Sequence, residues 1–356
     1  MFTDISADIP ADLSPRKRLW TRDLRTARIV RYAIGVTAAV ALAFGLDWPL
    51  FFVTPLFTAV FLAMPLAAPT IRESFHTMLY PLVAFAVGLV FTLLVLRYPL
   101  VYVPALGLVL FHIYYLANRG GPFVLVLMCL LAVLLLPLMA TQHPALAVVV
   151  ELYFVWSAVL AIILVLLAHG LFPDPPSERS VPSPAGFQPG YSSKAASAAL
   201  KSTAAILPLA TLFIAFSLTD QLLIMVFAAI FSLSPELTKG SAVALKSLTS
   251  TLIGGVAAVV FFYLIVAVPE FHFFIALMFF TTLLFGAGIF SDNPLAKYLS
   301  SAVTALLILL GTSMGEGASL TDKYIVRVLL ISGAGVYVVG ALSVFDHFWS
   351  RKNPRT

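Results

Sequence analysis

The sequence predicts an all-α, polytopic membrane protein of about 12 transmembrane helices, arranged as two parallel six-helix repeats. Its 356 residues are 61% hydrophobic and only 10% charged, which lies far outside the range of soluble globular proteins. Apolar runs of about 20 residues recur along the chain, and each is long enough to cross about 30 Å of hydrocarbon as a helix. One long polar stretch, Leu171–Lys194, separates two sets of these runs.

This polar stretch is rich in proline and serine, which deny it a helix, and it has too few apolar groups to fold alone. We therefore predict a linker on the membrane surface. The predicted parts of the chain are a cytoplasmic tail over residues 1–27 with a short surface helix from Arg18, a first six-helix repeat over 28–172, the cytoplasmic linker over 173–196, a second six-helix repeat over 197–347, and a cytoplasmic tail over 348–356. The predicted spans are 28–46, 49–68, 76–96, 99–117, 122–140, 145–171, 197–218, 221–235, 241–267, 270–290, 295–313 and 322–346.

The distribution of basic residues predicts the orientation of these spans. All but three of the 21 lysines and arginines fall on the side that holds both termini. The exceptions are Arg97, Lys323 and Arg327. Because cytoplasmic loops carry an excess of lysine and arginine, we expect both termini and the linker to lie in the cytoplasm of a bacterial cell, with the chain in the inner membrane.

The two halves share short sequence features. Asp47-Trp-Pro-Leu precedes the second span and Asp220-Gln-Leu-Leu precedes the eighth, while Phe61…Pro65 recurs as Phe231…Pro235. Six spans is an even number, so both halves have the same orientation. We predict that they are related by an axis along the membrane normal, as in transporters with parallel repeats.

Enzyme signatures do not occur in the chain. There is no phosphate-binding G-x-x-x-x-G-K-[ST] loop, no dinucleotide-binding glycine motif and no H-E-x-x-H, and the six histidines are scattered. Cys129 is the single cysteine, so no disulfide or cysteine metal cluster is available. We expect no catalytic residues, no metal and no cofactor, and we expect no nucleic-acid partner. A membrane enzyme acting on lipids is disfavoured because no set of acidic or histidine side chains converges at one depth.

Two ionisable residues lie inside predicted spans. Glu151 is in the sixth span and Arg327 is at a similar depth in the twelfth. A charge at the centre of a bilayer costs about 2.5–3.5 kcal/mol on insertion scales, so a persistent one usually faces a cavity or a partner. We predict that the two form a gate or a proton-coupled pair on the outward side. The alternative is that Arg327 extends its side chain to the membrane surface and that a neighbouring residue satisfies the carboxylate of Glu151.

A second group of candidate residues lies at the cytoplasmic ends of spans two, three, eight and nine. Pro65 and Pro235 interrupt helices, and Arg72 and Lys246 supply positive charge nearby. Proline near a span end frees backbone carbonyls, which is tolerated beside a cavity or neighbouring protein. This arrangement suits an anionic substrate; the alternative is an ordinary cytoplasmic loop whose charges only set topology.

Small residues mark places where helices approach closely. Gly311–Gly315 and Ser332–Gly335 predict close packing within the bundle or between protomers. A homo-oligomer is therefore compatible with the sequence, and membrane lipids are expected partners.

The second half contains LIMVFAAIFSLSPELTKGSAVALKSLTSTLIGGVAAVV, residues 223–260. This stretch resembles the fusaric acid resistance protein family (FUSC) and the related aromatic acid exporters, in which a basic residue precedes a G-T-x-x-G-like helix start. Here Lys246-Ser-Leu-Thr-Ser-Thr-Leu-Ile-Gly-Gly255 occupies that place. The first half keeps the position as His76-Thr-Met-Leu-Tyr-Pro-Leu but loses the basic and glycine residues. The long exporters carry a substantial cytoplasmic domain that this chain lacks, so it resembles a compact branch of largely unknown function.

The resemblance implies an efflux permease of the bacterial inner membrane that exports small organic anions, chiefly aromatic carboxylates, with a periplasmic adaptor protein as a partner. Arg72 and Lys246 would then attract the substrate carboxylate. The alternative is a non-transporting membrane subunit that acts as a scaffold in an envelope or efflux complex.

Overall fold

The computed structural model describes residues 15–48, 50–64, 71–173, 190–219, 224–225, 241–314 and a few positions between 329 and 344. All regular secondary structure in these residues is helical. The ten helices of this part of the chain are α1 (Pro15–Gly45), α2 (Val53–Ala63), α3 (Ile71–Val95), α4 (Pro99–Asn118), α5 (Phe123–Gln142), α6 (Pro144–Leu171), α7 (Ser193–Ala215), α9 (Ser241–Ala267), α10 (Phe271–Ile289) and α11 (Ala296–Met314).

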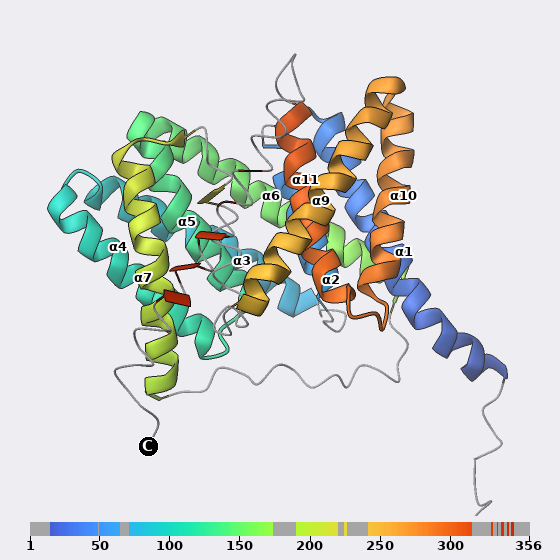
Figure 1. Ribbon diagram of the computed structural model, residues 1–356, viewed down its shortest axis with the longest axis horizontal. Coiled ribbons are helices and arrows are strands. Elements are labelled where there is room, and N and C mark those ends of the chain that lie inside the picture. The colour runs from blue at the N-terminus through green and yellow to red at the C-terminus, as the bar shows by residue number, and fades with distance from the viewer. Residues whose placement is uncertain are drawn as a thin grey trace, which may run out of the picture.

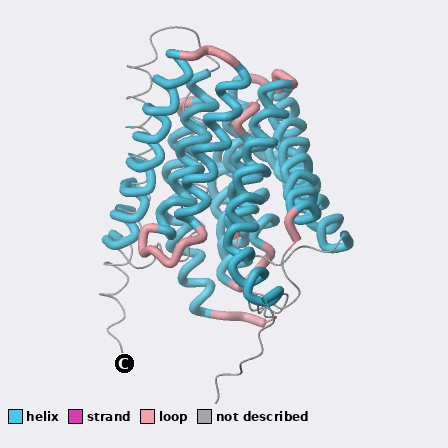
Figure 2. The backbone as a smooth tube through the Cα atoms, turned by 90° about the vertical axis from the view of Figure 1, so that its right-hand side faces the viewer, coloured by secondary structure: helices cyan, strands magenta, loops and turns pink. Residues whose placement is uncertain are grey.

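The helices run side by side along a common direction (Figure 2). Eight of them are long and apolar enough to cross a membrane, and two shorter apolar segments, Val53–Ala63 and Tyr298–Gly311, accompany them. Because a bilayer core offers no water to the backbone, a chain with this many apolar helices satisfies its peptide groups within each helix. The protein is therefore a multi-pass membrane protein with an all-α fold.

Each of the ten helices overlaps one predicted span; α3 and α7 begin earlier than predicted, at Ile71 and Ser193, and the bounds of α1 and α2 differ for reasons that the sequence explains. The predicted surface helix from Arg18 is not separate: α1 is continuous from Pro15 to Gly45, because no glycine or proline lies between Arg16 and Ile34 to interrupt it. Conversely, α2 is shorter than predicted. It ends at Ala63, and Met64 is extended with φ −74° and ψ 136° because the following Pro65 disfavours the helical conformation. The predicted eighth and twelfth spans fall largely outside the described residues.

The turns after α1 and α7 have the same backbone geometry. Asp47 and Ser217 adopt left-handed conformations, with φ 48° and 50°. At the first turn the amide of Asp47 donates to Phe44 O and that of Trp48 to Ala43 O; at the second, Ser217 N and Leu218 N donate to Ile214 O and Phe213 O in the same way. Both helices thus end in a Schellman-type cap that satisfies their last carbonyl groups. The counterpart of Asp47 in this geometry is Ser217, and Asp220 lies outside the described residues.

The helices pack in two groups (Figure 1). In one group α3 packs against α5, while α4 contacts α3, α5 and α7; in the other α9 packs against α11, while α10 contacts α9, α11 and α1. Helix α2 contacts α1, α6 and α11, and α6 contacts α1, α2, α3 and α5. The first helix of each half thus packs against the fourth helix of the opposite half, so the two groups are not the two halves of the sequence.

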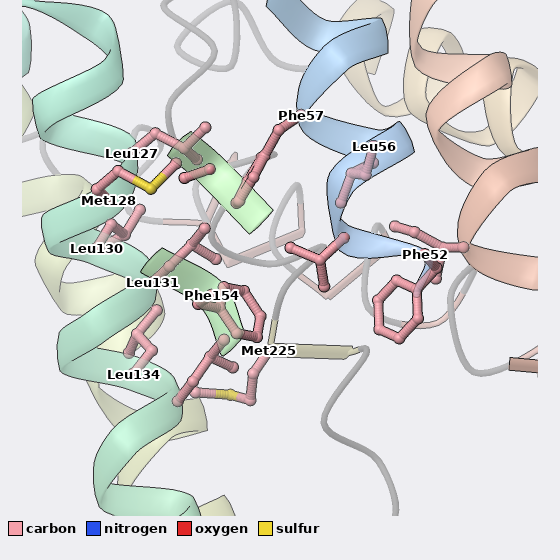
Figure 3. Close-up of a cluster of buried hydrophobic side chains, with 14 of the residues drawn as sticks. Phe52, Leu56, Phe57, Leu127, Met128, Leu130, Leu131, Leu134, Phe154 and Met225 are labelled. Carbon is pink, nitrogen blue, oxygen red and sulfur yellow. The ribbon is translucent and has the colours of Figure 1, made fainter. Parts of the chain in front are cut away.

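The core of the bundle is a cluster of apolar side chains around α5 (Figure 3). Nearly every α5 residue from Val126 to Leu138 is buried, so this helix is enclosed on all sides. Phe57 of α2 and Phe85 of α3 both contact Phe154 of α6, with ring centroids 6.3 and 5.5 Å apart. These three rings connect α2, α3 and α6 in the middle of the molecule.

Two close helix contacts recur in the two groups. In the first, which we call the α3–α5 seam, a Cβ added to Gly88 would lie 2.7 Å from the Ala132 Cβ. In the second, the α9–α11 seam, a Cβ added to Gly254 would meet the Ala302 carbonyl oxygen and lie 2.9 Å from the Ala305 Cβ. Small residues let helices approach closely in membranes. Gly311 of α11 similarly lies against Phe52, which confirms the close packing predicted for that glycine.

Candidate functional site

Glu151 lies in the second turn of α6, on a helix that is otherwise apolar over most of its length. It falls between Ala147 and Phe154, which are both buried and share its face of the helix at spacings of four and three residues. The side chain of Glu151 is itself partly exposed. Within the described residues it has no hydrogen bond and no ion pair. The structure therefore places a carboxylate on the packed face of a membrane-spanning helix.

Two aromatic residues follow Glu151 on α6, Tyr153 and Phe154. Phe154, one turn deeper than Glu151, stacks on Phe85 and contacts Phe57. Tyr153 meets Trp48 edge to face, with ring centroids 5.7 Å apart, which brings the turn after α1 to the same end of α6. Glu151 thus lies at the edge of an apolar, aromatic junction, where a charge is poorly solvated.

The other predicted site residues are only partly visible. Arg327, Pro65 and Pro235 lie outside the described residues, so the predicted pairing of Glu151 with Arg327 stays a prediction. Arg72 and Lys246 lie at corresponding ends of two helices: Arg72 is the second residue of α3 and Lys246 lies in the second turn of α9. Only their backbone is described.

Two arginines of α1, which the sequence marked only as indicators of orientation, bind helix ends. Arg31 is 5% exposed and donates from Nη1 to the Phe172 carbonyl oxygen at 3.1 Å, just beyond the last residue of α6. Arg25 donates from Nη2 to Ala287 O at 3.3 Å, in the last turn of α10. A cation there complements the negative end of the helix dipole. The spacing of α6 and α10 from α1 is not visible in the sequence, so no local signal identifies these contacts.

A buried hydroxyl pair joins α1 to α10. The Thr282 hydroxyl is 2.8 Å from Met278 O, its shortest acceptor distance, and has one proton to donate. Its lone pairs then accept the Thr37 hydroxyl, whose oxygen lies 3.2 Å away. Tyr32 packs beside this pair, against Gly286 and edge to face on Phe290. The α1–α10 contact thus combines a polar link with close apolar packing.

No group of three or more metal-ligating side chains occurs in the part of the chain that the structure describes. Residues 28–168 match the model of a family described as a protein of unknown function (DUF2955). This range begins within α1 and ends within the last turn of α6, so it coincides with the first set of six helices. No curated protein and no solved structure matches the chain. The description of the matched family names neither fusaric acid resistance nor the export of aromatic acids.

Proposed function

We propose that this protein is an inner-membrane efflux permease that exports small organic anions, with aromatic carboxylates as the expected substrates. In this proposal both termini lie in the cytoplasm, and 12 spans form two parallel repeats, as in some transporters. Arg72 and Lys246 attract the substrate carboxylate at the cytoplasmic mouth. Glu151, with Arg327, controls the outward side.

The observation that carries the proposal is the recurrence of the same helix contacts in both groups. The contacts of α3, α4 and α5 with one another return among α9, α10 and α11, and the α4–α7 contact returns as α10–α1. Burial recurs too: Tyr102, Leu106, Leu110 and Tyr114 of α4 are buried, as are Phe274, Met278, Thr282 and Gly286 at the same spacing in α10. This correspondence supports two parallel six-helix repeats, the architecture of many secondary transporters.

The position of Glu151 gives the second line of support. The energetic cost of a carboxylate in the membrane makes an intramembrane glutamate a functional candidate by default. Its place on the packed face of α6, beside the aromatic junction, sets it apart from glutamates at helix ends, such as Glu270 at the start of α10.

The proposal is tested by measuring the intracellular accumulation of labelled aromatic carboxylates in cells with and without the gene. We expect higher accumulation without the gene and restoration by the wild-type protein. Glu151→Gln keeps the side-chain volume and removes the charge, and it should abolish at least 90% of export, about the tenfold effect of one ionic interaction. Glu270→Gln is the matched control, because it makes the same change outside the span, and it should export normally.

Normal export by Glu151→Gln, at equal expression, would remove Glu151 from the mechanism. Equal accumulation with and without the gene, across a broad panel of organic acids, would contradict the permease itself. Co-purification with a periplasmic adaptor in that case would favour the scaffold alternative.

A further inference from the structure

The inner part of the α9–α11 seam differs in chemistry from the rest of the bundle. The two helices run in the same direction, because the single helix α10 connects them, so both amino-terminal ends lie at one end of the seam. In Figure 1 this is the lower end. Between those ends and the contact at Gly254, hydroxyl residues gather on both helices: Thr249, Ser250, Thr251, Tyr298, Ser300, Ser301 and Thr304.

Ser250 is the informative member of this group. It precedes Gly254 by one turn, so it lies on the face of α9 that meets α11. Ser250 is 1% exposed, and its hydroxyl has no hydrogen-bond partner. A buried hydroxyl without a partner loses its hydrogen bonds to water and gains none in exchange, which destabilises the folded state. Thr304 differs, because its hydroxyl donates to Ser300 O at 3.2 Å. The seam therefore holds an unused, buried donor.

Two lysines occupy the same region by register. Lys246 precedes Ser250 by one turn of α9, and Lys297 precedes Ser301 by one turn at the start of α11. The amino-terminal ends of both helices add partial positive charge at this end. The one acidic residue of the loop before α11 is Asp292, which is exposed. By sequence, the first two turns of α9, the first turn of α11 and the loop before α11 therefore hold two lysines and one acidic residue.

The α3–α5 seam shows that packing does not require these polar groups. It makes the same glycine-to-alanine contact, yet α5 carries no hydroxyl and no lysine from Phe123 to Met139. On α3, Ala84 precedes Gly88 by one turn, as Ser250 precedes Gly254 on α9, and alanine offers no hydroxyl. A glycine-to-alanine contact of this kind thus forms without such hydroxyls and lysines, so packing alone does not explain why the α9–α11 seam has them.

We propose that the inner part of the α9–α11 seam binds a monovalent oxyanion, and that Ser250 donates a hydrogen bond to it. Hydroxyl donors, lysines and helix amino-termini are the groups that stabilise a carboxylate or phosphate oxygen away from water. The proposal rests on the export function above and assigns the carboxylate site to the second half alone. The same chemistry fits the headgroup of an anionic phospholipid, so the experiment has an arm for each source.

The test uses the full-length protein in nanodiscs of phosphatidylcholine and measures benzoate binding by calorimetry. Ser250→Ala and Lys297→Gln should each weaken binding about tenfold or more, because each removes a donor to a charged group. Lys297→Arg should retain binding. Lys194→Gln is the matched control: it removes a lysine from the start of α7, where the side chain is exposed, and should bind as the wild type does.

The second arm replaces benzoate with phosphatidylglycerol and follows the thermal unfolding midpoint. Stabilisation of the wild type, but not of Ser250→Ala or Lys297→Gln, would support the site and identify its ligand as a lipid headgroup, which would contradict the carboxylate cargo. Benzoate binding that is unchanged in both variants would overturn the site and leave the export proposal standing. Binding of neither benzoate nor phosphatidylglycerol by the folded wild type would overturn the site outright.

Discussion

In the α3–α5 seam, Gly88 lies against Ala132 of α5, a helix that carries no hydroxyl from Phe123 to Met139; in the α9–α11 seam, Gly254 lies against Ala302 and Ala305 of α11, beside a run of hydroxyl residues on both helices. Both contacts are close enough that a methyl group on the glycine would collide with the facing helix. The geometry is shared, while the chemistry of the surrounding residues is not.

This difference distinguishes the glycine and alanine residues that the fold needs from the polar residues that a function could use. Helix association in membranes depends on close packing rather than on a hydrophobic driving force between helices, and a glycine facing an alanine provides that packing. Because the α3–α5 seam assembles with no hydroxyl on α5 from Phe123 to Met139, the buried, unpartnered hydroxyl of Ser250 is not needed for packing in the other seam. The two halves thus share a scaffold, and the second half is the one expected to hold the anion.

The largest expected effect is on stability, when the glycine of each seam is replaced by alanine. Gly88→Ala should lower the free energy of unfolding by about 1–3 kcal/mol, a usual cost of overpacking, and Gly254→Ala by more. The reason is that the new Cβ at position 254 would meet the carbonyl oxygen of Ala302, which belongs to the backbone and has little freedom to move. SDS-induced unfolding in mixed micelles measures both values.

A reciprocal change sharpens this comparison. Ala132→Gly should restore much of the stability of Gly88→Ala, because the clash at 2.7 Å is with the Ala132 Cβ and the next contact is at 3.3 Å. Ala305→Gly should fail to rescue Gly254→Ala, since the Ala302 carbonyl remains in place. Gly170→Ala is the control: no atom lies within 4 Å of its added Cβ, so it should be neutral or stabilise α6 by up to about 1 kcal/mol. Equal rescue in both seams would show that the two contacts are alike.

The seams also show what the sequence was able to predict. The hydropathy of α3, α5, α9 and α10 locates these spans, because apolar backbone in a bilayer has no stable alternative to the helix. Single residues set the exact ends of the helices: α2, for example, ends before Pro65. Partner choice was not predictable: nothing in the pattern of α1 indicates that it packs against α10, since that contact depends on a glycine and a threonine pair far apart in the chain.

The candidate site was predictable to the same limited degree. Glu151 and Lys246 are conspicuous as single charged letters in apolar surroundings. Ser250 is not conspicuous, because serine is tolerated in membrane helices, where its hydroxyl usually bonds to a backbone carbonyl of the preceding turn. Its unpartnered state is visible only in three dimensions.

A smaller effect is expected at the arginines of α1. Arg31→Gln should lower the free energy of unfolding by about 1.5–3 kcal/mol, the range for hydrogen bonds to charged groups, because Arg31 is buried and binds the carbonyl of Phe172. Arg25→Gln should cost less than about 1 kcal/mol, since its bond to Ala287 O is exposed and screened by water. Equal costs at both positions would mean that burial does not decide the strength of these helix-end contacts.

The smallest effect is expected at the threonine pair between α1 and α10. Hydrogen bonds between membrane helices contribute about 0.6 kcal/mol on average, so a double-mutant cycle of Thr37→Val and Thr282→Val should give a coupling energy near that value. In the α4–α7 contact, the position that corresponds to Thr282 is Leu110, which offers no hydroxyl. A coupling energy well above 1 kcal/mol would mean that the polar link, rather than the close packing that both contacts share, holds α1 on α10. A coupling energy of zero would leave packing alone as the reason that the first helix of each half lies against the opposite half.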